Sequence, residues 1–193
     1  MKNKPSATDE TPLRADAIRN RERILEAAEQ MFIERGADVS LDDIARRAGV
    51  GIGTLYRRFP TRDALLAATS DERLLSLARA SRARDDRLEP DASIRVFVKE
   101  LVTHASHYRG LAALLGTVLQ SDTPGCHAGL EEGRRLLQRA QKAGTVRKDV
   151  SLDDLVCIVT AISLALEQGG TARSRVGHLV DLFLGGIGNT PAT

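Results

Sequence analysis

The chain has 193 residues and a net charge of only +2, with 42% hydrophobic, 28% charged and 3% aromatic side chains, a composition that favours a soluble helical protein over a strand-rich one. Two cysteines are too few for a disulfide framework, which indicates the reducing cytosol, and the polar N-terminal residues lack the apolar core of a signal peptide. The longest uncharged stretch, residues 155–166, is too short to cross a bilayer, so we expect a cytoplasmic protein without membrane contact, in which any affinity for nucleic acid comes from a local cluster of charge.

The first part of the chain shows four helical segments in succession. Residues 1–17, with two prolines and mixed charge, are predicted to be a mobile tail. From Ile18 apolar residues recur at helical spacing until Gly36, which is typical of a helix end. Ser40 begins a short second helix with a Ser-x-x-acid start signal, a third helix follows, and Thr61 caps a longer fourth.

The rest of the chain continues as helices. A polar segment with a proline, residues 85–91, is predicted to be a loop after the fourth helix. Apolar periodicity predicts helices at 93–108, 111–119, 130–142 and 155–167, and a last one that begins near Val176 after a break at Gly169-Gly170. Ser151-Leu152-Asp153-Asp154 repeats the Ser-x-x-acid start signal before the helix at 155–167. No stretch alternates as a strand would, so the predicted fold class is all-α.

Residues 40–60 have the pattern of a helix-turn-helix, in which two short helices meet at a tight turn. Ala45 is small where the helices cross, and Gly49 can adopt the left-handed backbone of the turn at low cost. Val50 and Leu55 anchor the second helix to the core. The side chains left on its outer face, and therefore available to DNA, belong to Ile52, Gly53, Thr54, Arg57 and Arg58.

Positive charge is concentrated in the same segment. Five arginines fall within seventeen residues: Arg46, Arg47, Arg57, Arg58 and Arg62. Such a cluster is usually a solvated helix face, but within a helix-turn-helix it is positioned to contact a DNA groove. Tyr56 has two interpretations, a DNA contact or a half-buried core residue.

Several motifs follow one another in a fixed order between residues 24 and 66. They include Ile24-Leu25-Glu26-Ala27-Ala28, Phe32-Ile33-Glu34-Arg35-Gly36, Ala45-Arg46-Arg47-Ala48-Gly49-Val50 and Leu55-Tyr56-Arg57-Arg58-Phe59-Pro60. This set resembles the TetR family of repressors over roughly residues 20–70. The C-terminal part, with His107-Tyr108-Arg109-Gly110-Leu111-Ala112 and Gln141-Lys142-Ala143-Gly144, is similar to the SbtR-like subgroup. The resemblance implies a helix-turn-helix DNA-binding domain at residues 18–66 and an effector-binding and dimerisation domain at 67–193.

The resemblance also assigns DNA contacts by position. The positions that contact phosphates in family members are occupied here by Ser40, Thr54, Tyr56 and Arg62, and those that face base edges by Ile52, Gly53 and Arg57. Ile52 and Arg58 differ from the residues that many relatives carry, so the operator sequence stays open. An arginine could pair with guanine, and Ile52 could pack on a thymine methyl group.

A dimer is expected from the C-terminal helices. The segment 155–166 is uncharged on every side, and such a helix must be enclosed on all faces. With the last helix it is predicted to form a four-helix interface with a second copy, as the TetR resemblance also implies. A homodimer would place two recognition helices about one DNA turn apart, on an inverted-repeat operator. The predicted interface residues are Leu155, Ile158, Ile162, Val176, Leu179, Val180, Phe183 and Leu184.

The resemblance further implies a pocket for a small-molecule effector, whose identity the sequence leaves open. Helical register gives as its lining Phe97, Leu101, His104, Tyr108, Leu115, Leu119, Cys157 and Thr160. Effector binding is expected to shift the fourth helix, which bridges the two domains, and so to spread the recognition helices. We expect no cofactor and no bound metal.

Four alternatives remain beside this interpretation. His104 and His107, one helical turn apart, could bind a metal together with Cys126-His127, although this spacing is not a recognised one. Cys126, expected to be the more exposed cysteine, could sense oxidants, whereas Cys157 would be inert inside an apolar helix. An enzyme is disfavoured because the chain has no nucleophile elbow, phosphate-binding loop or apolar carboxylate pair. Salt-dependent binding to a specific palindrome would exclude a helical protein-interaction module.

Overall fold

The computed structural model describes residues 10–168 and 173–188. The α-helices within these ranges are α1 (Glu10–Arg35), α2 (Leu41–Ala48), α3 (Ile52–Arg58), α4 (Arg62–Ala83), α5 (Pro90–Ala105), α6 (Leu111–Leu119), α7 (Pro124–Lys142), α8 (Leu152–Gln168) and α9 (Val176–Ile187), with short 3-10 turns at Asp85–Arg87 and Arg173–Arg175. Over the same ranges the one extended pairing is an isolated bridge between Val146 and Gly188, so the all-α prediction is confirmed. None of the helices described is both long and apolar enough to cross a bilayer. The break predicted at Gly169-Gly170 lies outside the described residues.

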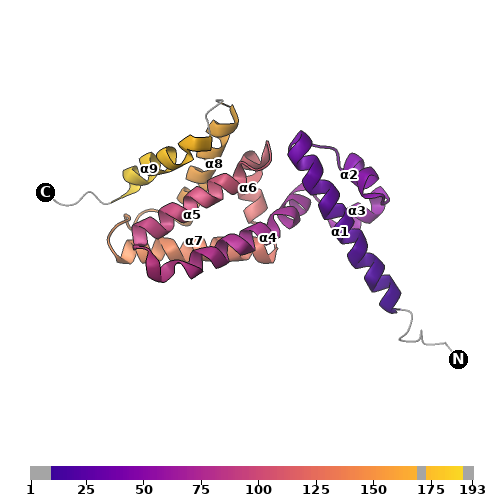
Figure 1. Ribbon diagram of the computed structural model, residues 1–193, viewed down its shortest axis with the longest axis horizontal. Coiled ribbons are helices and arrows are strands. Elements are labelled where there is room, and N and C mark those ends of the chain that lie inside the picture. Colours follow the sequence, from indigo (N-terminus) through magenta and orange to yellow (C-terminus); the bar gives the residue numbers. More distant parts are fainter. Residues whose placement is uncertain (1–9, 169–172, 189–193) are drawn as a thin grey trace.

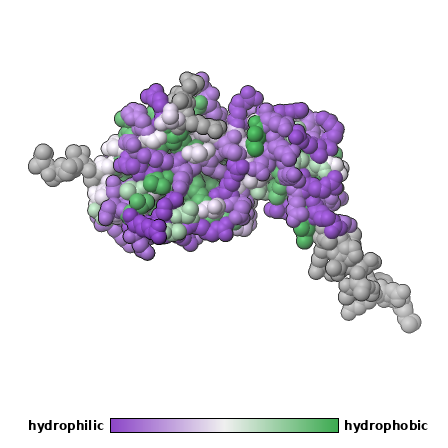
Figure 2. Space-filling model, in the orientation of Figure 1, coloured by the Kyte–Doolittle hydropathy of each residue, from purple (hydrophilic) through white to green (hydrophobic). Residues whose placement is uncertain are grey.

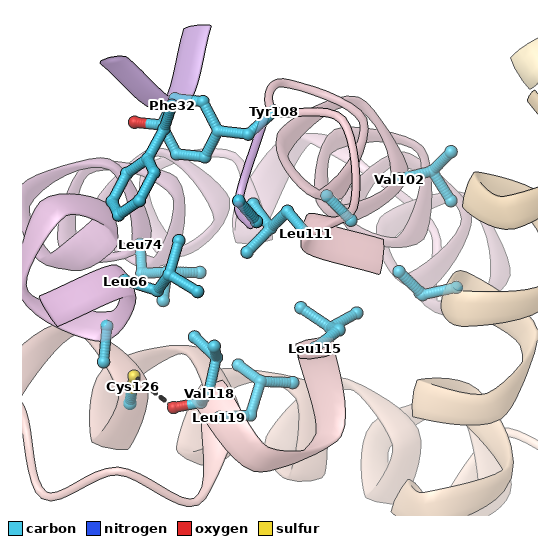
Figure 3. Packing of buried hydrophobic residues seen from close by; sticks show 14 of the residues in the cluster. Phe32, Leu66, Leu74, Val102, Tyr108, Leu111, Leu115, Val118, Leu119 and Cys126 are labelled. Carbon is cyan, nitrogen blue, oxygen red and sulfur yellow. Dashed lines mark hydrogen bonds between the residues drawn. The ribbon is translucent and has the colours of Figure 1, made fainter. Parts of the chain in front are cut away.

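Two groups of helices share one long helix (Figure 1). α1–α3 form a small unit at one end of the molecule, α5–α9 form a larger unit at the other, and α4 runs from the first into the second. The hydrophobic core is one cluster that passes from Phe32 on α1 through Leu66 and Leu74 on α4 to Leu115 on α6 (Figure 3). α4 is therefore a wall that both units share.

Capping residues start several helices where the sequence predicted. The Ser40 hydroxyl accepts a hydrogen bond from a first-turn amide of α2 at 3.2 Å, and the Thr61 hydroxyl does the same for α4 at 3.1 Å. Before α8, the Ser151 hydroxyl accepts from the Asp154 amide at 3.1 Å, while the Asp154 carboxylate accepts from the Ser151 amide at 2.7 Å. These are local bonds between residues a few positions apart, so the sequence alone can indicate them.

Four helices begin earlier than predicted, among them α8, which begins at Leu152 instead of Leu155. α1 begins at Glu10 instead of Ile18, because apolar periodicity marks only the part of a helix that packs on a core. Residues 10–17 are thus helical and not part of a tail. α5 and α7 begin at Pro90 and Pro124, where a missing N–H costs nothing because first-turn amides have no acceptor within the helix.

α4 and α7 approach each other closely. At Gly125 an added Cβ would overlap the Asp71 carbonyl oxygen on α4, so this position of α7 accepts only glycine. The Gly125 amide also donates to the Asp71 carboxylate at 2.5 Å. Further along, a methyl group at Gly129 would make ordinary contact with Leu74 at 3.6 Å. Small residues on α7 therefore set the distance between the two helices.

Candidate nucleic-acid interface

The α2–α3 pair has the helix-turn-helix geometry expected from the sequence. Gly49 has φ 64° and ψ 37°, in the left-handed region that favours glycine. The Val50 amide then donates to the Ala45 carbonyl at 3.0 Å, which closes the turn. Ile44, Ala45 and Leu55 are buried. This inward face fixes α3 on the small unit and leaves its opposite face to solvent.

The outer face of α3 is open. A Cβ at Gly51 or Gly53 would meet no atom within 4 Å. Tyr56 is 47% exposed and is not part of the hydrophobic core, so its side chain is available on this outer face. The Arg57 guanidinium is exposed and donates to the Thr54 hydroxyl at 3.1 Å. The side of the α1–α3 unit visible in Figure 2 is mostly hydrophilic, as a surface that meets DNA should be.

The five clustered arginines differ in their partners. Arg46 is paired with an aspartate one turn earlier on α2, and Arg47 binds the Glu34 carboxylate of α1 through hydrogen bonds of 2.8 and 2.9 Å. Arg57 and Arg58 are exposed and form no ion pair with any residue that the structure describes. Positive charge that is free to meet phosphate or base edges is thus concentrated at the end of α3.

Arg62 has a different role from the phosphate contact that the resemblance implied. Its guanidinium donates to the Ala37 carbonyl at 2.7 Å and to the Val39 carbonyl at 2.5 Å, and the side chain is partly buried. Arg62 therefore fixes the α1–α2 loop against the start of α4. That loop ends at Ser40, the exposed cap of α2, so Arg62 positions the helix-turn-helix from behind.

An apolar cavity of about 20 Å³ lies within the larger unit. Three of the predicted pocket residues line it: Phe97, Leu101 and Leu119. The structure adds Val98, Gly129, Leu130, Gly133, Leu152, Leu155 and Val156. None of these described lining residues carries a charged or hydrogen-bonding side chain. The space is about that of one water molecule, so a larger occupant fits only if a wall moves.

The other predicted pocket residues lie elsewhere. His104, Tyr108 and Leu115 are buried in the core and do not line the cavity. Cys157 is exposed on the surface of α8, and Thr160 on the same helix is only partly buried and is not among the lining residues. Helical register correctly predicted that α5 contributes to the lining of the cavity. It did not predict the lining residues of α7, because two glycines and one leucine form no apolar stripe in the sequence.

Two family models match the chain. Residues 24–69 match the tetR family of bacterial regulatory proteins. Residues 89–189, more than half of the chain, match the C-terminal domain of SbtR-like transcriptional regulators. The chain belongs to the TetR family. The resemblance seen in the sequence is confirmed for both parts.

Known proteins of the family share its length and fold. AqdR of Rhodococcus erythropolis, an HTH-type transcriptional regulator, is 29% identical over 170 residues, 83% of this chain and 76% of AqdR. The crystal structure of the TetR regulator SCO0520 from Streptomyces coelicolor is 32% identical with a TM-score of 0.54, covering 88% of this chain and 99% of that one. Thermus thermophilus FadR, a repressor solved with lauroyl-CoA, has a TM-score of 0.62 at 21% identity over 90% of this chain and 98% of its own, which shows the fold alone. Several Staphylococcus aureus regulators match at 48–50% identity over 48 residues, 26% of their length.

The two units of this TetR-family protein meet at the loop between α5 and α6. The Ala37 amide donates to the Arg109 carbonyl at 2.8 Å, and a Cβ at Gly36, where φ is 91°, would lie 2.8 Å from that same oxygen. The Tyr108 ring packs on Phe32, with ring centres 5.7 Å apart, and under the Arg73 guanidinium at 5.9 Å. Arg73 was not predicted, since nothing near it in the sequence indicates a partner so far along the chain.

The predicted dimer residues divide into two groups. Leu155, Ile162, Val180 and Leu184 are buried in the chain's own core and leave almost no surface for a second copy. A uniformly apolar helix has no polar side to show which face is internal. Ile158, Val176 and Leu179 are partly buried and Phe183 is 44% exposed. Of the described residues that sequence reasoning missed, Leu182 is 59% exposed.

The expected environments of the two cysteines are reversed. Cys126 is buried in the first turns of α7, where its thiol donates to the Val118 carbonyl at 3.2 Å and burial raises its pKa, so it lacks the exposed thiolate of a redox sensor. Cys157 is exposed. Thr123 caps α7 by accepting a hydrogen bond from the Cys126 amide, so Cys126 lies inside a helix that was predicted to begin only at residue 130. The described residues contain no group of three metal-binding side chains; His104 is buried whereas His127 is exposed.

Proposed function

We propose that this TetR-family protein is a cytoplasmic repressor that binds an inverted-repeat DNA operator as a homodimer and is released by a small-molecule effector. The observation that carries this function is the open outer face of α3, whose two terminal arginines form no ion pair with any described residue. Arg57, Arg58, Ile52 and Gly53 would face bases in the major groove, while Ser40, Thr54 and Tyr56 would contact phosphates. No catalytic activity is assigned to it.

The homodimer is supported by the apolar surface of α8 and α9. Cys157, Ala161 and Ala165 recur along the exposed side of α8, and Leu182 and Phe183 are exposed on α9. Large apolar side chains gathered on one exposed surface are typical of a protein–protein contact. Ile158, Val176 and Leu179 would be completed by the partner copy.

The chemistry of the effector is limited by the cavity that would hold it. Every lining side chain is apolar or absent, and burying a charged or unpaired polar group there would be costly. The part of the effector that enters between α5, α7 and α8 is therefore neutral and apolar, of aromatic or alkyl type. Any polar part must lie outside these walls.

The test of DNA recognition is selection of duplexes from a random pool with the purified protein. We expect an inverted repeat to be enriched, with affinity that falls steeply as salt rises. Arg57→Ala should relax the base preference by about 1–3 kcal/mol per half-site, whereas Tyr56→Phe should weaken binding to all duplexes alike. Equal affinity for every duplex would exclude a sequence-specific regulator.

A further inference from the structure

α7 separates the cavity from α4, the helix that leads to the DNA-binding unit. α4 contributes no residue to the cavity lining, whereas α7 contributes Gly129, Leu130 and Gly133. A Cβ at Gly133 would lie 3.1 Å from Leu152 and 3.4 Å from Phe97, two residues of the opposite walls. An occupant larger than the present space would therefore press on α7, the lining helix that packs most extensively on α4.

The other side of α7 carries a buried carboxylate that binds α4. Glu132 is fully buried. It accepts hydrogen bonds from the Ser81 hydroxyl at 2.6 Å and the Arg82 guanidinium at 3.0 Å, both near the end of α4, and from Arg135 on its own helix at 2.7 and 2.9 Å. Burial alone would raise the pKa of Glu132, but these hydrogen bonds from Arg135, Ser81 and Arg82 outweigh it and lower the pKa to about 2. The carboxylate is thus ionised at every physiological pH.

Further hydrogen bonds hold α7 in place, some around the Glu132 carboxylate and one near the start of α7. Arg135 also binds the Asp85 carboxylate at 2.9 Å, and Arg139 binds the same group at 2.6 Å and the Ser93 hydroxyl of α5 at 3.1 Å. Toward the start of α7, Asp71 accepts from the Gly125 amide. Two polar attachments, separated by close packing of small residues, make it costly for α7 to slide along α4.

We propose that α7 transmits occupancy of the cavity to α4, with Glu132 as the positioning residue that makes the two helices move as one body. This inference rests on the proposed function, because it takes the cavity as the effector site. A displacement of α7 then carries Ser81 and Arg82 with it, and α4 conveys the movement to the helix-turn-helix at its other end. The hydrogen-bonded group of Glu132, Ser81 and Arg82 is therefore the element whose position both the occupied cavity and the bound operator would shift.

The test uses substitutions in place of the unidentified effector. Gly133→Ala places a methyl group into the cavity wall, and Gly116→Ala on α6, where an added Cβ meets nothing within 4 Å, is the matched control. Each is combined with Glu132→Gln, with Ser81→Ala, and with Ser93→Ala. Ser81 and Ser93 are both buried serines bonded to the same charged cluster, but only Ser81 lies on α4.

Operator affinity, measured on the selected duplex, should fall about threefold or more with Gly133→Ala, the lower range for coupled residues. The loss should persist in the Ser93→Ala background and largely disappear with Glu132→Gln or Ser81→Ala. Equal losses in all backgrounds would overturn the proposal, as would unchanged affinity in Gly133→Ala alone.

Amide hydrogen exchange of the full-length variants supplies a readout that needs no operator. Gly133→Ala should accelerate exchange in the last turns of α4 together with α7, and Gly116→Ala should not. Exchange in α4 that keeps its natural rate overturns the proposal. Failure to enrich any duplex would instead reject the proposed function while this coupling could still be demonstrated.

Discussion

His104 is a buried histidine near the junction of the two units, and loss of solvent determines its charge. Burial lowers its pKa from 6.5 to about 4, and the charges of Arg73 and His107 act in the same direction. Between pH 6.5 and 4 the unfolded chain therefore takes up a proton that the folded chain excludes. The free energy of unfolding should decrease over this window as the pH falls, by up to roughly 3 kcal/mol.

The variant His104→Gln should remove this part of the pH dependence, so its unfolding free energy should vary less between pH 6.5 and 4. Urea unfolding at a series of pH values measures the difference. His127→Gln, at an exposed histidine, is the control and should follow the natural protein. Glu132, with its pKa lowered to about 2, contributes stability that is lost between pH 4.5 and 2, a range that meets this window only at its acid end. Parallel curves for His104→Gln and the natural protein would contradict the assignment.

α3 is a short helix in which stability and DNA contact make opposite demands. Gly53 lies inside the helix, and a Cβ there would meet no atom within 4 Å. Gly53→Ala should therefore raise the unfolding free energy by up to about 1 kcal/mol, while the new methyl group keeps the backbone away from the DNA groove and weakens operator binding. Gly116→Ala on α6, equally free of contacts, should add stability without this loss. A Gly53→Ala protein that binds its operator normally would show that α3 does not approach DNA at this point.

Helix ends marked by a capping residue could be predicted from the sequence, whereas the faces of apolar helices could not. Ser40, Gly49 and Ser151 act on backbone groups within a few residues, so their chemistry is local and visible in the sequence. Leu155 and Cys157 lie two positions apart on α8, yet one is buried and the other exposed. The sequence of a uniformly apolar helix does not indicate which of its faces will be covered by neighbouring helices. The contribution of Gly133 to the cavity wall was not predicted for a related reason. A glycine has no side chain, so it can be assigned to a cavity only when the residues around it are known.

The hydrogen-bond partners of charged residues could not be predicted from the sequence either. An arginine at the start of α4 suits a phosphate contact by position, but Arg62 reaches carbonyl groups more than twenty residues earlier in the chain. The outward-facing residues of α3 were easier to select, because the turn at Gly49 and the buried Leu55 together fix which side of this short helix points outward.

The molecule as a whole leaves an apolar surface on α8 and α9, and its oligomeric state should depend on that surface. Phe183, 44% exposed, lies with Cys157 and Ile158 along a groove between the two helices. In a two-fold symmetric dimer each substitution occurs twice in the interface, so Phe183→Asp should bury two charges and shift the protein to monomers.

Sedimentation velocity of the full chain measures this shift directly. The matched control is Ile33→Asp, the same change in charge at a 56% exposed residue of α1, which should leave the dimer intact. Monomers of Phe183→Asp would engage one half-site at a time and should bind the inverted repeat far more weakly, because the second contact is no longer intramolecular. Affinity for an isolated half-site should be unchanged, since α3 lies in the other unit. A Phe183→Asp protein that sediments as the natural protein does would place the dimer interface on another surface.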